Sequence, residues 1–214
     1  MKEIKFNCLS NLAIINRNAQ LSSNCIIEPF VIIGHPEAWK SIDYINSGYE
    51  GIDDFFCKES LKNVFIGEES VIRSGSVIYE NVKIGSHFQC GSNVIIRSSC
   101  VIGNNVFIKN NTEIMRNVQI GNNCRLAGSI CDFTQMGDNV YSYGMIVHKQ
   151  NNGVTEEERM RAPIIGKNVL IGRGAVVMGK IRVGNNVIIG ANAFVDKDVP
   201  DNMKVIGLNK HYYL

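Results

Sequence analysis

The chain has 214 residues, 45% of them hydrophobic, and its 22 Lys and Arg nearly balance 20 Asp and Glu, which leaves a net charge of +2. This balance, without a basic run, argues against nucleic acid or a membrane surface as a partner. No stretch reaches the ~18 apolar residues of a membrane helix, and the opening MKEIKF has no apolar signal core after it, so we expect one cytoplasmic domain over residues 1–214.

The organising feature of the sequence is an aliphatic anchor at every sixth position, followed four residues later by a second small or aliphatic side chain. In chain order, the pattern is weak over residues 9–33, regular over 66–126 and regular again over 165–195. Between the regular blocks the frame slips by four residues near 126–130. A fixed short period of this kind predicts a repeat architecture.

A period of six fits neither a helix, with 3.6 residues per turn, nor an ordinary strand, whose side chains alternate every two residues. If each hexad is a short strand and a bend, three hexads close one triangular coil, and coils stack ~4.8 Å apart as strands of parallel sheets. Gly follows many anchors and Asn-Asn pairs often come next, as at 104–105, 122–123 and 185–186. We predict bends with positive φ at these residues.

The seven cysteines are odd in number and form no CxxC pair, so the sequence indicates neither a disulfide framework nor a zinc site. Cys25, Cys100 and Cys124 occupy the small inward position of the repeat, and Cys90 occupies an anchor. We therefore interpret these four as compact core residues.

Two insertions interrupt the hexads, at residues 35–63 and 148–163. The first is aromatic and acidic and holds the only tryptophan, Trp39, and the second is polar with three charges of each sign. Two interpretations of the first stay open: it covers the acceptor or a neighbouring subunit, or it is a packed connector.

The segment IGKNVLIGRGAVVMGKIRVGNNVIIGANAFVDKDVP, residues 165–200, resembles the hexapeptide acyltransferase family, and the likeness extends over nearly the full chain. Within the family, IRSGSVIYENVKIG followed by NVIIR is similar to the branch that acetylates nucleotide-linked sugars or related surface-glycan intermediates. The resemblance implies an all-β, left-handed parallel β-helix, acetyl-CoA as co-substrate, a sugar or nucleotide-sugar acceptor and a homotrimer with sites between subunits.

Acyl transfer to a hydroxyl or amine needs a base, and His148 is the strongest of the four histidines, which also include His35, His87 and His211. It follows the apolar run GMIV and opens the second insertion. Family members carry a polar catalytic or acceptor-binding residue ahead of the returning PxIG block, here residues 163–166, which supports His148 as the catalytic base.

Two further residues are candidates for substrate contact. Family members with the VIY pattern continue GH-N, whereas this chain has Ser92 at the histidine position, which changes the site. His87, five residues earlier, is the second candidate, although we expect it on a neighbouring face.

The resemblance also implies a groove for acetyl-CoA along the last coils, with Arg173, Ala191 and Lys197 at the family's binding positions. The tail reproduces the family's VxGNPAK sequence only in part, through Asn209 and Lys210. No Ser or Cys lies in a nucleophile motif such as GxSxG, so we expect direct attack within a ternary complex and no metal.

Two alternatives differ from acetyl transfer. A non-catalytic β-helix scaffold or binding subunit needs no intact IGANA…DKDVP block, because fold does not fix function. A zinc carbonic anhydrase on the same helix needs three converging histidines. The acetyltransferase is the interpretation that uses the motifs present.

Overall fold

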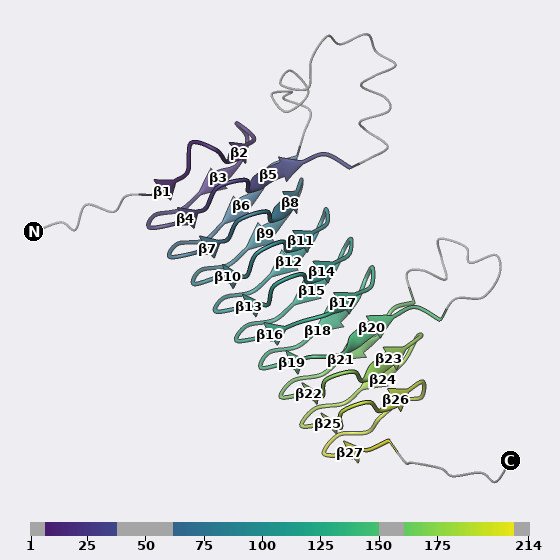
Figure 1. The fold of residues 1–214 in the computed structure, drawn as a ribbon. Helices are drawn as coiled ribbons and strands as arrows, with labels where there is room; N and C mark the ends of the chain where they lie inside the picture. Colours follow the sequence, from purple (N-terminus) through teal and green to yellow (C-terminus); the bar gives the residue numbers. More distant parts are fainter. Residues whose placement is uncertain (1–6, 38–61, 150–160, 208–214) are drawn as a thin grey trace, which may run out of the picture.

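The computed structural model describes residues 7–37, 62–149 and 161–207, and there the chain winds into a column of stacked triangular coils with three parallel sheets as its walls (Figure 1). We call the sheets A, B and C in the order in which each coil visits them. The first and last described strands, β1 (Cys8–Leu9) and β27 (Lys204–Val205), lie at opposite ends of the column (Figure 1). No helix that could cross a membrane occurs in these ranges.

Sheet A has ten strands: β1 (Cys8–Leu9), β4 (Ile26–Ile27), β7 (Val71–Ile72), β10 (Gln89–Cys90), β13 (Phe107–Ile108), β16 (Arg125–Leu126), β19 (Tyr141–Ser142), β22 (Leu170–Ile171), β25 (Ile188–Ile189) and β27 (Lys204–Val205). Sheet B has nine: β2 (Ile14–Ile15), β5 (Ile32–His35), β8 (Val77–Tyr79), β11 (Ile95–Ile96), β14 (Glu113–Ile114), β17 (Ser129–Ile130), β20 (Met145–Val147), β23 (Val176–Met178) and β26 (Phe194–Val195). Sheet C has eight: β3 (Gln20–Leu21), β6 (Phe65–Ile66), β9 (Lys83–Ile84), β12 (Val101–Ile102), β15 (Gln119–Ile120), β18 (Gln135–Met136), β21 (Ile164–Ile165) and β24 (Arg182–Val183).

Most strands contain two residues, the first facing outward and the second facing inward. Each strand pairs with the strand one coil away in parallel register, as Cys90 does with Ile108. The backbone groups are satisfied between coils, as where Gln89 donates its N–H to the carbonyl of Val106 at 2.9 Å. This confirms the predicted left-handed parallel β-helix.

The core is the interior of the prism, filled by the two inward positions of each hexad. The anchors from Ile66 to Leu126 and from Ile165 to Val195 are all buried, and so are the residues four positions later. In the first coil the pattern weakens: Leu9 is 46% exposed, and Leu21 is only half-buried, because that coil is stacked on one side only. Burial of the repeated positions is the main stabilising term of this fold.

The predicted cause of the glycine repeat is wrong. In the two regular blocks, residues 66–126 and 165–195, no glycine that directly follows an anchor has positive φ, although Gly34 after Ile33 does (φ 85°). In the regular blocks that conformation falls two residues later, on Asn105 (φ 55°), Asn123 (57°) and Asn186 (56°). The glycines are needed for close stacking: a Cβ on Gly121 would lie 2.6 Å from the carbonyl carbon of Gly137 in the next coil. The corner asparagines then form a ladder, in which the Nδ2 of Asn105 donates to the Oδ1 of Asn123 at 2.9 Å.

The frame slip has a structural counterpart. Between sheets A and B, the step from Leu126 to Ile130 takes four residues, with Gly128 at φ 94° in the shortened corner. The pairing of β16 with β19 and of β17 with β20 continues past it, so the prism is preserved.

The cysteine interpretation is confirmed. Cys25, Cys90, Cys100 and Cys124 are buried and unpaired in disulfides. Burial raises the pKa of the Cys100 thiol to about 12 and that of the Cys124 thiol to about 11. These thiols therefore behave as small apolar side chains.

Candidate functional site

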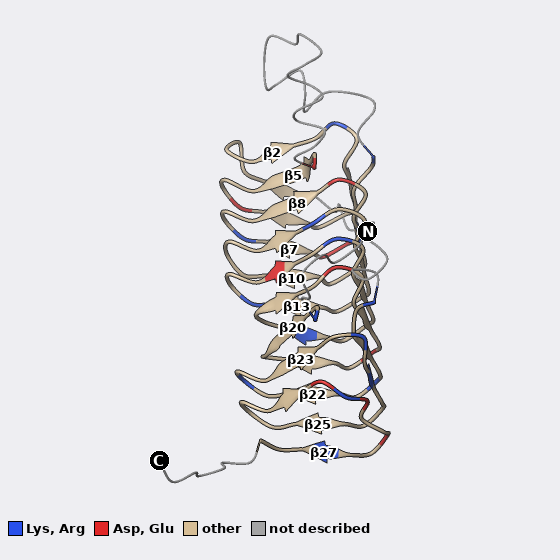
Figure 2. Cartoon of the chain, turned by 90° about the vertical axis from the view of Figure 1, so that its right-hand side faces the viewer, with Lys and Arg blue, Asp and Glu red and all other residues tan. Residues whose placement is uncertain are grey.

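The corner between sheets B and C, named here the B–C corner, is the irregular edge of an otherwise regular prism. Both insertions leave the column there, the first between β5 and β6 and the second between β20 and β21 (Figure 1). Their described ends are residues 35–37 and 62 for the first and residues 148–149 and 161–163 for the second, and Trp39 lies outside the described residues. The strands themselves carry few charges, which gather on the loops with both signs interleaved (Figure 2).

A single column of residues follows this corner from coil to coil. Each member lies two residues after the inward anchor of a sheet B strand, and the register of that sheet aligns them. In order the members are Glu80, Ser98, Arg116, Asp132, His148, Gly179 and Lys197. At ~4.8 Å per coil, His148 lies roughly 10 Å along the axis from Arg116 on one side and from Lys197 on the other.

His148 directly follows β20 and is half-buried, with both ring nitrogens shielded from solvent. The neighbouring coil fixes its backbone, because Gly179 donates its N–H to the carbonyl of Val147 at 3.0 Å. On the other side, the buried Asp132 carboxylate accepts the N–H of Arg116 at 2.8 Å and lies 3.6 Å from the Arg116 Nε. The backbone that bears the His148 imidazole is therefore held in place at the end of β20 by the neighbouring coils.

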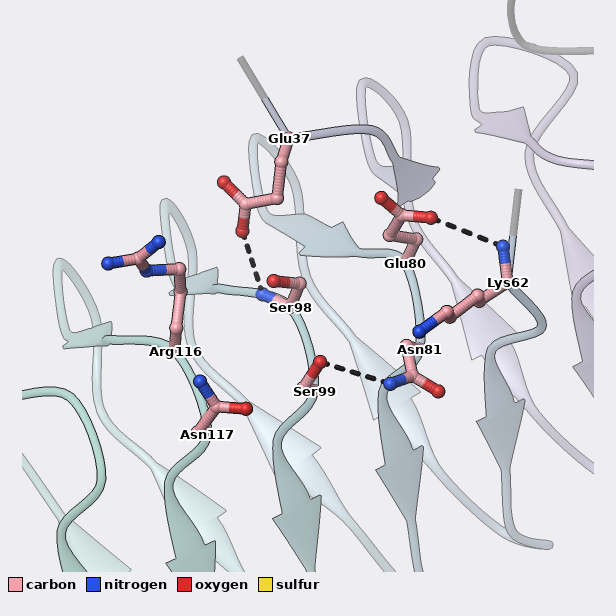
Figure 3. Close-up of a pocket in the computed structure, with 8 residues that line it drawn as sticks. All are labelled: Glu37, Lys62, Glu80, Asn81, Ser98, Ser99, Arg116 and Asn117. Carbon is pink, nitrogen blue, oxygen red and sulfur yellow. Dashed lines mark hydrogen bonds between the residues drawn. The ribbon is translucent and has the colours of Figure 1, made fainter. Parts of the chain in front are cut away.

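A cavity of about 240 Å³ opens at the same corner, at the third to fifth coils counted from the end of the column that holds β1. Its lining residues, labelled in Figure 3, are Glu37, Lys62, Glu80, Asn81, Ser98, Ser99, Arg116 and Asn117. They come from three successive coils and from the two ends of the first insertion.

Two buried carboxylates shape this cavity. The Oε1 of Glu37 accepts the N–H of Ser98 at 3.3 Å (Figure 3). Its Oε2 lies 3.7 Å from the Arg97 Nη1. The Oε2 of Glu80 accepts the backbone N–H of Lys62 at 3.2 Å. Both glutamates are more than nine-tenths buried, so the ends of the insertion are tied to the prism by hydrogen bonds with charged acceptors.

The predicted acetyl-CoA residues divide between two corners. Arg173 and Ala191 lie in adjacent coils at the corner between sheets A and B, both exposed, and the N–H of Asn192 donates to the Arg173 carbonyl at 3.0 Å. Lys197, also exposed, lies at the B–C corner with His148. The proposed tail residues Asn209 and Lys210 lie outside the described residues.

The predicted substrate residues lie away from His148. His87 is at the corner between sheets C and A, with φ 57° and its Nδ1 3.2 Å from the Glu69 carboxylate. Ser92 is at the corner between sheets A and B, and its N–H donates to the Asn110 side chain at 3.1 Å. Within one chain, neither shares a corner with His148.

Of the other histidines, His35 packs against Tyr79 at the base of the first insertion, with the ring centroids 4.8 Å apart and the ring planes tilted by 46°. His211 lies outside the described residues. Across residues 7–37, 62–149 and 161–207, no three His, Cys, Asp or Glu side chains are grouped as metal ligands would be.

The sequence interpretation missed the cavity. Glu80, Ser98 and Arg116 carry no family motif, and hexad counting alone assigns no residue to a particular corner. Two features of the sequence could have indicated this corner. A charged or hydroxyl residue stands two positions after most sheet B anchors, which are every third anchor, and both insertions begin after a sheet B anchor.

Comparison with known proteins supports the repeat. Residues 99–129 and 162–197 match the family model described as bacterial transferase hexapeptide (six repeats). A serine acetyltransferase from Staphylococcus aureus is 42% identical over 76 residues, which cover 36% of this chain and 34% of that protein, and one from Staphylococcus epidermidis is 40% identical over 76 residues. The chain thus aligns with about a third of the length of these curated relatives.

Among solved structures, a UDP-N-acetylglucosamine acyltransferase from Campylobacter jejuni superposes with a TM-score of 0.56 at 17% identity, covering 89% of this chain and 68% of that one. At this identity the likeness concerns the fold, and it extends over most of the column.

Proposed function

From a column that carries hexapeptide-transferase repeats over residues 99–129 and 162–197, we propose that this chain is an acetyltransferase, which moves the acetyl group of acetyl-CoA to a hydroxyl or amine of a small acceptor. The observation that carries the proposal is the alignment of His148 and Lys197 on one corner of that column, two coils apart. In this arrangement His148 can act as the base and Lys197 can bind a phosphate of acetyl-CoA, which is long enough to lie along the prism.

In the proposed reaction, His148 accepts the proton of the acceptor hydroxyl or amine as that atom attacks the thioester carbonyl. The tetrahedral oxyanion collapses with cleavage of the carbon–sulfur bond, and the imidazolium returns its proton to the CoA sulfur. Lys197 binds donor phosphate, and Arg173 and Ala191 contact the donor from a neighbouring copy or from the adjacent corner. No acyl-enzyme forms.

The acceptor we propose is a sugar or nucleotide sugar, with His87 and Ser92 as substrate contacts in the trimer. Support comes from the VIY segment, residues 77–79, and from the fold shared with the Campylobacter UDP-N-acetylglucosamine acyltransferase. Because the curated relatives are serine acetyltransferases, L-serine is the alternative acceptor against which the sugars should be compared. In a homotrimer, residues on different corners of one chain can face a neighbouring copy across the same groove.

The first test is calorimetric titration of the protein with acetyl-CoA. We expect micromolar binding that Lys197→Ala weakens about tenfold or more, because a charge-assisted contact to phosphate is lost. Lys83→Ala, an exposed lysine on sheet C, is the matched control and should leave binding unchanged. Absence of binding at millimolar acetyl-CoA would instead favour a non-catalytic scaffold.

The base is tested with His148→Ala. We expect acetyl transfer to fall by roughly 10²–10⁴-fold, with the acetyl-CoA affinity nearly unchanged, as for loss of a general base. The measurement is thiol release from acetyl-CoA with nucleotide sugars, amino sugars and L-serine as acceptors. Wild-type turnover in this variant would remove His148 from the mechanism.

A further inference from the structure

We propose that the cavity between Glu37 and Asn117 is a subsite for a neutral or amino-bearing sugar ring, and that this ring belongs to a part of the acceptor that is not itself acetylated. The proposal rests on the proposed function for its second half only. The first half, a sugar-ring site, stands on the cavity itself.

The chemistry of the walls selects the ligand class. The carboxylates of Glu37 and Glu80 accept hydrogen bonds. The amides of Asn81 and Asn117 and the hydroxyl of Ser98 both donate and accept. Because these groups come from successive coils, acceptors and donors repeat along the wall at the ~4.8 Å strand spacing. Such an array suits a ring with several hydroxyl groups in fixed positions.

The charge balance disfavours a phosphate or nucleotide in the cavity. Arg116 already faces the Asp132 carboxylate at 3.6 Å, and Arg97 behind the wall is shared between Glu37 at 3.7 Å and Glu113 at 3.8 Å. Among the described lining residues, Lys62 is thus the one cation whose ammonium forms no ion pair, and Glu37 and Glu80 are both buried in the same wall. A neutral polyol or an amine is therefore the better electrostatic match.

Size gives the same answer. The cavity of about 240 Å³ is below the ~300–1,000 Å³ typical of sites that enclose a drug-sized ligand, so it holds one ring rather than a whole nucleotide sugar.

Position explains why this ring is not the reacting one. Arg116 is the member of the corner column in the cavity wall that lies nearest His148, and it is two coils, or roughly 10 Å, from His148 along the same corner. An acceptor that spans both must be longer than one ring. Binding energy from the remote ring would then position the reacting group.

The test uses the full-length protein and saturation-transfer NMR titrations with methyl α-D-glucopyranoside, D-glucosamine and uridine diphosphate. We expect the two sugars to bind and Glu37→Gln to weaken them about tenfold, because a charged acceptor becomes neutral while its shape and its bond to Ser98 are kept. Glu113→Gln removes the other carboxylate beside Arg97 from outside the cavity, so it should leave sugar binding unchanged. Asn117→Gly, at φ 58°, keeps the backbone conformation and should also weaken binding.

Sugar binding that is insensitive to both cavity variants, or binding of uridine diphosphate alone, would overturn the subsite, and so would absence of binding by every probe. Titration of the same samples with acetyl-CoA separates the two proposals. Retained acetyl-CoA binding without sugar binding leaves the acetyltransferase standing and removes the subsite. Sugar binding that Glu37→Gln weakens, without acetyl-CoA binding, supports the ring site and removes the acetyltransferase.

Discussion

At the scale of single residues, the prism interior contains hydroxyl groups with different environments. The Ser76 hydroxyl donates to the Gly91 carbonyl at 3.1 Å and accepts the Val94 N–H at 3.2 Å. The buried Ser142 hydroxyl occupies an anchor position and has no hydrogen-bond partner within the described residues. One serine therefore completes the backbone bonding of its coil, and the other carries a desolvation cost.

This contrast predicts opposite effects of one substitution. Ser142→Ala should raise the free energy of unfolding by about 1 kcal/mol, because it removes a desolvated hydroxyl without a partner. Ser76→Ala should lower it by about 1–3 kcal/mol, because the Val94 N–H and the Gly91 carbonyl lose their partner. Urea unfolding at fixed protein concentration measures both. Equal destabilisation by the two changes would contradict this account of Ser142.

At the scale of the repeated element, close stacking of backbone at the corner determines where glycine is required. Gly121 faces the backbone of Gly137 and Asp138 in the next coil, at 2.6 and 2.7 Å from the position of an added Cβ. Gly190 occupies the same hexad position nearer the end of the column, where the nearest atom is the Val205 carbonyl oxygen at 3.3 Å. Identical sequence positions thus differ in the space that the neighbouring coil leaves.

We therefore expect Gly121→Ala to lower the free energy of unfolding by about 1–3 kcal/mol, since the backbone of Gly137 and Asp138 in the next coil must move. Gly190→Ala should have a clearly smaller effect, because a shift of a few tenths of an ångström accommodates the methyl group. Thermal and urea unfolding of the two variants against wild type provide the comparison. A larger loss for Gly190→Ala would refute the stacking argument.

At the scale of the whole molecule, sheet A is one of two outer faces of the prism that carry an apolar column. Tyr141, Leu170 and Ile188 are paired in register on sheet A and are 42%, 38% and 44% exposed. On sheet C the exposed Val101 is isolated between Lys83 and Gln119. A contiguous apolar strip on a flat face is typical of a contact between copies of the chain.

The proposed homotrimer predicts a solution mass three times the 23.8 kDa of one chain. Leu170→Glu should reduce that mass, because it buries a charge in the apolar contact, whereas Val101→Glu should leave it unchanged. Light scattering after size-exclusion chromatography measures the mass. A monomeric wild-type protein would remove both the trimer and any site between subunits.

The sequence alone determined the architecture and most of the core. A period of six with inward residues at two fixed positions is a local property, and each hexad packs only against its neighbours in the coils above and below. The burial of Ile66, Val94 and Cys100 could therefore be predicted residue by residue. The exposure of Leu9 could not, because it depends on where stacking ends.

Only the tertiary structure decided which residues share a corner. Hexad counting predicts whether a side chain faces inward or outward, but it does not predict on which sheet or corner of the prism that side chain lies. The insertions and the four-residue steps also change the number of residues from one coil to the next. His148 and Lys197, almost fifty residues apart, thus lie along one edge of the prism with Glu37 and Arg116, whereas His87 lies on another edge. The physical reason is that a coil closes only after three hexads, so neighbours in space are set by winding and not by sequence distance.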